Sequence, residues 1–157
     1  MKTLRLQTPF LVSVVILLIS ACSQNSKNTF DLTAARKGID EGNKAIMEFI
    51  MKSDSVGVSN MYTADAKIMA PGGPAVPKEQ IRSFIHTLSV MGIKDFRLKT
   101  VDIWGNQDLI GEEGTWSVHD DKGTELDHGK YIVLWKQENN QWKLFRDCWN
   151  SDVPPAK

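Results

Sequence analysis

The spacing of apolar residues changes once along the chain, and this change limits the possible fold more than any other feature of the sequence. Up to Gly92, apolar residues recur at intervals of about 3.6 residues, the period of an α-helix. After Gly92 they alternate at a period of two, as in β-strands. Helices followed by a run of strands predict an α+β fold, with the helices covering one face of an antiparallel sheet.

Three helices are expected before Gly92. The first begins at Asp31 or Thr33, whose side chains can accept hydrogen bonds from free backbone N–H groups. Its apolar stripe consists of Leu32, Ala35, Ile39, Ile46, Phe49 and Ile50. The second helix covers residues 55–62. The third begins at Pro77, where the missing N–H costs nothing, and ends near Gly92.

Five strands are expected, over residues 66–70, 96–104, 109–118, 126–137 and 141–150. The short turns between the last four favour antiparallel hairpins. Strand 126–137 has large apolar residues on both alternating faces: Ile132 and Leu134 on one, and Tyr131, Val133 and Trp135 on the other. A strand that is apolar on both faces needs two covers. We therefore expect the helices on one face and a second copy of the chain, forming a homodimer, on the other.

The first 21 residues predict export, and Cys22 predicts a lipid anchor. Lys2 and Arg5 precede an apolar run, residues 10–19, which has the length of a signal-peptide core but is too short to span a membrane. Residues 18–22 resemble the lipobox of bacterial lipoproteins, which implies cleavage before Cys22 and lipidation of its thiol. Ser23 is not the aspartate of an inner-membrane retention signal, so we expect attachment to the outer membrane, facing the periplasm. An ordinary signal peptide followed by a chance cysteine is the alternative.

The remainder of the chain has the size of one slightly acidic domain. Removal of residues 1–21 leaves 17 basic against 19 acidic residues, which gives no basic surface for nucleic acid. The expected order is signal peptide 1–21, lipidated cysteine and polar tether 22–30, folded domain 31–152 and tail 153–157. With Cys22 lipidated, Cys148 has no intrachain partner, and we expect it to be a small buried apolar residue.

Three stretches of the chain resemble a known superfamily. They are Tyr62–Gly73 (YTADAKIMAPGG), Gly129–Lys136 (GKYIVLWK) and Gln141–Asp152 (QWKLFRDCWNSD). They resemble the nuclear-transport-factor-2-like (NTF2-like) superfamily, with its SnoaL-like and ketosteroid-isomerase-like members, and most closely its domain-of-unknown-function 4440 branch. The resemblance implies a cone, in which a strongly curved antiparallel sheet wraps around three helices and leaves a pocket at its mouth. It also implies dimerisation through the outer sheet face.

The resemblance does not extend to the isomerase chemistry. Ketosteroid isomerases of this superfamily have a general-base aspartate, an oxyanion tyrosine and a protonated aspartate, which correspond to Ala70, Ile46 and a position near Ile132 in this chain. None of these three side chains can transfer a proton. We therefore do not expect ketosteroid-isomerase activity, because a fold alone does not imply a function.

Asp147 is the strongest candidate for a site residue. Strict alternation puts it on the same strand face as Phe145 and Trp149, where a carboxyl group among aromatic side chains would have a raised pKa. Such a group can act as an acid, a base or a polar anchor. The alternative is a structural ion pair with Arg146, Lys143 or a helix lysine. A pocket wall is expected from residues that would also suit ordinary core packing: Tyr62, Met69, Trp116, His128, Tyr131 and Trp149.

No cofactor or metal site is expected from the sequence. His119, Asp120, Asp121, Asp127 and His128 lack the spacing of metal ligands, and an exposed hairpin tip explains them. The leading hypothesis is a lipid-anchored domain that binds a small hydrophobic or amphipathic molecule in its cone. The rivals are an isomerase, dehydratase or hydrolase with Asp147 as base and Tyr62 or His128 as partner, and a module that binds another envelope protein.

Overall fold

The computed structural model describes residues 30–89 and 93–154. The expected signal peptide, the lipidated Cys22, most of the tether and the end of the third helix at Gly92 lie outside the described residues. Among the described residues, no helix combines the length and the apolar character needed to cross a membrane.

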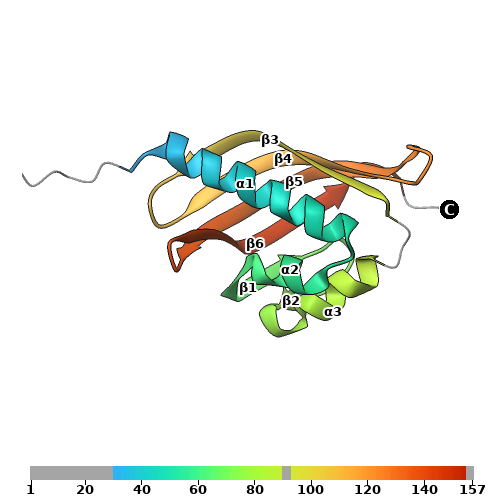
Figure 1. The fold of residues 1–157 in the computed structure, drawn as a ribbon, viewed down its shortest axis with the longest axis horizontal. Helices are drawn as coiled ribbons and strands as arrows, with labels where there is room; N and C mark the ends of the chain where they lie inside the picture. The colour runs from blue at the N-terminus through green and yellow to red at the C-terminus, as the bar shows by residue number, and fades with distance from the viewer. Residues whose placement is uncertain (1–29, 90–92, 155–157) are drawn as a thin grey trace, which may run out of the picture.

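The helices lie on one face of a single curved sheet (Figure 1). In chain order the elements are α1 (Leu32–Met51), α2 (Ser55–Asn60), β1 (Tyr62–Met69), β2 (Val76–Pro77), α3 (Lys78–Ser89), β3 (Asp95–Gly105), β4 (Ile110–His119), β5 (Glu125–Glu138) and β6 (Gln141–Ser151). The strand order in the sheet is β2-β1-β6-β5-β4-β3. Neighbouring strands are antiparallel except for β1 and β6, which are parallel. The α+β class with three helices against a curved sheet is confirmed.

Helix α1 packs on the sheet through small and apolar residues. Asp31 caps the helix, its carboxylate accepting hydrogen bonds from the N–H groups of Thr33 and Ala34 at 2.9 and 3.1 Å. A side chain at Gly42 would come within 3.2 Å of the Trp135 indole of β5. The absence of a side chain at Gly42 therefore allows the helix to approach the sheet closely.

Strand β5 has the two-faced pattern expected from the sequence. Tyr131, Val133 and Trp135 are buried beneath the helices, whereas Ile132 is 54% exposed on the opposite, outer face. Leu134 is half-buried on that outer face. The two apolar faces of this strand are thus confirmed.

Several local expectations are wrong. Strand β1 begins at Tyr62, a residue expected in the second helix, and the short strand β2 is not among the expected strands. Cys148 is exposed, because it pairs with Ile132 on the outer face. His119 is buried instead of lying at an exposed tip, because β4 continues through it and it pairs with Glu125 of β5. Pro77 ends the short strand β2, and the third helix begins one residue later.

A fully buried carboxylate, Glu112 of β4, lies at the centre of the fold. Its Oε1 accepts hydrogen bonds of 2.7 Å from Asn43 Nδ2, the Thr100 hydroxyl and the Tyr131 hydroxyl. Its Oε2 accepts one of 2.8 Å from Trp135 Nε1. The donors come from α1, β3 and β5, so one residue joins the first helix to three strands. A buried carboxylate is tolerated only when donors satisfy it in this way.

The approach of Tyr131 to Glu112 depends on a glycine. Gly114 of β4 is the register partner of Tyr131 on β5. A side chain at position 114 would overlap the Tyr131 ring. Gly114 therefore lets the ring lie across β4 with its hydroxyl directed at the carboxylate.

We expect Glu112→Gln to destabilise the protein, because the amide NH₂ of glutamine would replace one of the two acceptor oxygens of Glu112. A buried donor that hydrogen-bonds to that oxygen in the wild type would then lack an acceptor. A buried polar group left without its partner costs about 1–3 kcal/mol, so the free energy of unfolding measured by urea denaturation should fall by that amount. Glu113→Gln, at the next and exposed position of β4, is the control and should change the value by less than about 0.5 kcal/mol. Equal losses at the two positions would contradict the role given to Glu112.

Candidate functional site

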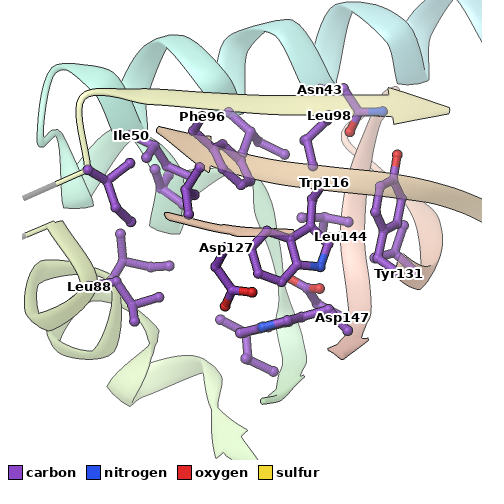
Figure 2. Close-up of a pocket in the computed structure, with 18 of the residues that line it drawn as sticks. Asn43, Ile50, Leu88, Phe96, Leu98, Trp116, Asp127, Tyr131, Leu144 and Asp147 are labelled. Atoms are coloured by element: carbon purple, nitrogen blue, oxygen red, sulfur yellow. The ribbon is translucent and has the colours of Figure 1, made fainter. Parts of the chain in front are cut away.

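A cavity of about 470 Å³ lies between the inner face of the sheet and the helices (Figure 2). Aliphatic and aromatic side chains form most of its wall, among them Ile50, Leu88, Phe96, Leu98, Trp116 and Trp149. Its polar lining residues are Asn43, Tyr62, Asp127, Tyr131 and Asp147. This volume, an apolar wall and a few polar groups are typical of small-molecule sites.

Asp147 reaches the cavity from β6, in the middle of the sheet. Its register partners on the adjacent strands, Ile68 and Val133, also face inward and are buried. The Tyr62 hydroxyl donates a hydrogen bond of 2.5 Å to Asp147 Oδ2. Oδ1 accepts no hydrogen bond from the described residues and is not fully buried by them. One carboxylate oxygen is therefore available to a ligand.

The apolar surroundings change the acidity of this pair. Burial raises the pKa of Asp147 to about 6, against the opposing effect of the Tyr62 hydrogen bond and with a further increase from the charge of Glu112. Burial, followed by the charge of Asp147, raises the pKa of Tyr62 well above its usual value. At neutral pH the cavity thus holds a mostly ionised carboxylate and a neutral phenol. A carboxylate with this pKa can exchange a proton under ordinary conditions.

Asp127 is the second carboxylate in the cavity wall. Its Oδ1 accepts hydrogen bonds from the Ser151 hydroxyl at 2.6 Å and from the His128 N–H at 2.8 Å. Asn43 and Tyr131 also border the cavity, but both donate to Glu112. The two aspartates are therefore the charged groups that a ligand in the cavity would meet first.

Most of the residues predicted for the pocket wall come together there: Tyr62, Trp116, Tyr131, Asp147 and Trp149. Met69 and His128 do not. Met69 follows the inward-facing Ile68, so alternation turns it to the outer surface, where it is 37% exposed. His128 likewise follows the cavity-lining Asp127, is exposed, and lies with its Nδ1 2.8 Å from Glu125. Strand alternation thus corrects the expected position of both residues.

Strict alternation puts Phe145 on the same face as Asp147, but Phe145 does not line the cavity. Phe145 is the extra residue of a β-bulge, and Lys136 Nζ and the Arg146 guanidinium lie 3.5 and 3.6 Å from its ring centroid. Arg146 donates to the carbonyls of Asp65 and Phe145 instead of pairing with Asp147. Lys143 pairs with Glu138 at 3.3 Å. The ion pairs with Arg146 and Lys143 expected as an alternative for Asp147 are therefore absent.

Asn43 and Glu112 position the Tyr131 side of the cavity, and neither is among the site residues predicted from the sequence. A signal for each is present in the pattern. Glu112 shares an alternating face with Ile110, and Asn43 lies in the helix stripe between Ile39 and Ile46. A polar residue inside an apolar stripe indicates a buried hydrogen-bonding partner elsewhere in the chain. Among the described residues, no cluster of His, Cys, Asp or Glu is arranged to hold a metal ion.

Solved structures match this fold, whereas no protein-family model matches the chain and no curated protein matches its sequence. A domain of unknown function with a cystatin-like fold from Nostoc punctiforme has a TM-score of 0.67 at 12% identity, over 78% of this chain and 80% of that one. A protein of unknown function from Mycobacterium tuberculosis has a TM-score of 0.66 at 16% identity, over 77% and 73%. A candidate dehydratase from the NTF2-like family of Streptomyces avermitilis has a TM-score of 0.65 at 13% identity, over 79% and 100%.

The chain has the cystatin-like, NTF2-like fold. The shared fold explains why a curved sheet and helices enclose a cavity here. It does not determine what the cavity holds, because proteins with one fold perform different functions.

We expect Asp147→Asn to stabilise the protein at neutral pH. Asparagine keeps an acceptor for Tyr62 and removes the cost of a charge in the cavity. The folded-state pKa of Asp147 is raised from 3.8 to about 6. Protonated Asp147 therefore contributes fully to stability below about pH 4, and this contribution is lost as the pH rises through about 6. The free energy of unfolding of Asp147→Asn should therefore exceed that of the wild type by about 1–3 kcal/mol at pH 7.5, and should be similar to it at pH 4.

Urea denaturation at the two pH values measures this difference. Asp108→Asn, at an exposed turn position, is the matched control and should stay within about 0.5 kcal/mol of the wild type at both. A variant at position 147 that is no more stable than the wild type at pH 7.5 would show that the carboxylate is not held in an apolar site.

Proposed function

We propose that this domain binds a small, mostly apolar molecule in its cavity, with the free oxygen of Asp147 as the polar anchor. The observation that supports this function is a single available oxygen of Asp147 in the wall of a largely apolar cavity of about 470 Å³. An apolar wall holds the body of such a ligand, and one polar contact fixes its orientation.

Within the NTF2-like fold, we propose membership of the domain-of-unknown-function 4440 branch. The support is the resemblance of residues 62–73, 129–136 and 141–152 to that branch.

An acid–base enzyme is the second candidate, and the Tyr62–Asp147 hydrogen bond favours it. A carboxylate with a pKa of about 6 can abstract a proton from an apolar substrate, and the neutral Tyr62 holds it in place. The similarity to a candidate dehydratase agrees with such chemistry. Incorporation of solvent deuterium into a bound substrate, lost in Asp147→Asn while binding persists, would distinguish catalysis from binding.

Leu98→Trp should block the cavity. Leu98 forms part of the wall from β3, and an indole there would occupy space that a ligand needs. With the fragment 23–157, we expect the neutral fluorescent probe N-phenyl-1-naphthylamine to bind the wild type and to lose at least about tenfold in affinity in Leu98→Trp. Val101→Trp, at an exposed position of the same strand outside the cavity wall, is the control and should bind as the wild type does. A wild type that does not bind the probe, or equal binding by the two variants, would contradict the proposal.

We also propose that the domain is exported and tethered by a lipid on Cys22, at the outer membrane facing the periplasm. The support is the signal-peptide pattern of residues 1–21 and the lipobox-like residues 18–22, followed by a polar segment that ends where α1 begins. Attached acyl chains hold a protein durably at a bilayer when more than one is present.

Cys22→Ser should release the protein from the membrane. In a bacterial host supplied with an alkyne analogue of palmitate, the wild type should incorporate the label and sediment with membranes, whereas Cys22→Ser should do neither. The chain has two cysteines, so Cys148→Ser is the matched control and should keep both properties. Label retained by Cys22→Ser would refute the anchor.

A homodimer through the outer sheet face is the assembly we propose. Trp104 and Ile132 are 44% and 54% exposed on that face. In the register of the sheet, Gly111 of β4 separates Trp104 from Leu134, and Ile132 pairs with Cys148 of β6. A contiguous exposed apolar patch marks an interaction surface. A monomer in native mass spectra of the wild type at micromolar concentration would favour the alternative, another envelope protein on this face.

A further inference from the structure

The charged groups around the cavity are all acidic. Among the described residues that line it, Asp127 and Asp147 are the charged ones, and the wall contains no lysine, arginine or histidine. Glu112 adds a third carboxylate, 2.7 Å behind the Tyr131 hydroxyl. Carboxylates gathered in a low-dielectric hollow produce a negative potential that concentrates cations.

These three carboxylates have no cationic partner in the described part of the chain. None of Asp127, Asp147 and Glu112 belongs to an ion pair there. Lys78, which lies near Tyr62, directs its ammonium at the backbone carbonyls of Ser59 and Tyr62. No cationic side chain among the described residues balances this negative charge, so a cationic ligand would be attracted to the cavity.

Aromatic faces in the same cavity suit a positive charge as well. Trp116 and Trp149 line the wall, and the Trp116 indole is held by a hydrogen bond of 3.1 Å from its Nε1 to the carbonyl of Asn150. Figure 2 shows Trp116, Asp127 and Asp147 turned into one cavity. The face of an indole attracts an ammonium group, and most strongly where water is excluded.

We propose that the preferred ligands of this cavity are lipophilic organic cations, above all protonated amines with a compact apolar body. The ammonium group would lie at Asp147 Oδ1, and the apolar body would contact the aliphatic wall. A fatty acid or other anion of the same size would bring a further negative charge close to three carboxylates that have no cationic partner. Such an anion should therefore bind much more weakly. This inference rests on the proposed function, because it specifies the ligand of the same cavity.

The charge state of Asp147 makes the preference depend on pH. The ionisable groups that face Asp147 are Tyr62 from β1, Glu112 from β4 and Tyr131 from β5. Burial keeps both tyrosines neutral, because it raises the pKa of each hydroxyl. Protonation of Asp147, with its pKa of about 6, removes the anionic partner of the amine. Affinity for a protonated amine should therefore fall as the pH drops below 6, whereas a neutral hydrogen-bond acceptor should gain affinity.

Three ligands with one apolar cage and different charges test the proposal: 1-adamantylamine, 1-adamantanol and adamantane-1-carboxylate. We would measure their affinities by calorimetry with the protein purified from a bacterial host in nanodiscs, with empty nanodiscs as the blank. At pH 7.5 the amine should bind at least about tenfold more tightly than the alcohol, and the carboxylate more weakly than both. At pH 5 the advantage of the amine over the alcohol should be largely lost.

Asp147→Asn should reduce the affinity for the amine by about tenfold and change that for the alcohol by less than about threefold. Asp108→Asn should leave both unchanged. Equal affinities for amine and alcohol, or tightest binding of the carboxylate, would overturn the inference while leaving cavity binding, as tested with Leu98→Trp, in place. Failure of all three compounds to bind, together with failure of the neutral probe, would overturn both proposals.

Discussion

The fold and the site both depend on the buried carboxylate of Glu112. Its four hydrogen bonds join α1 to β3, β4 and β5, and each donor would be left unsatisfied if the helix moved along or away from the sheet. The same bonds fix Asn43 and Tyr131 at the cavity wall. Its charge also contributes to the raised pKa of Asp147. A single side chain therefore holds the helix over the curved sheet and sets part of the electrostatics of the space between them.

The parts of this structure that local geometry determines could be predicted from the sequence. A period of two puts successive side chains on opposite faces, which is why Tyr131, Val133 and Trp135 of β5 could be assigned to one shared face. The structure shows that this face is the inner one. The same rule puts Asp147 and Trp149 on one face of β6, and the structure shows that this face lines the cavity. Asp31 begins α1 because its carboxylate accepts the N–H groups that every helix leaves free at its start.

The remainder depends on contacts between distant residues. The bulge at Phe145 and the register shift beside His119 change which way side chains point, and alternation alone cannot predict either. The parallel pairing of β1 with β6 joins the first long strand to the last one. Asn43 lies 69 residues before Glu112, so no local pattern connects the two. The polar network was therefore outside what periodicity can show, although a glutamate on an apolar strand face was a sign of it.

The proposed function requires a negative charge at Asp147, held in an apolar cavity with one carboxylate oxygen free. Titration of the Asp147 side-chain carboxyl, followed by carbon-13 NMR, measures this directly, because the signal reports the environment of that one group in the folded protein. We expect a midpoint of about 6, and a higher midpoint in Tyr62→Phe, where the anion loses its hydrogen-bond donor. A midpoint at the ordinary value of 3.8, unchanged by Tyr62→Phe, would mean that the carboxyl faces open water and would rule out Asp147 as a buried polar anchor.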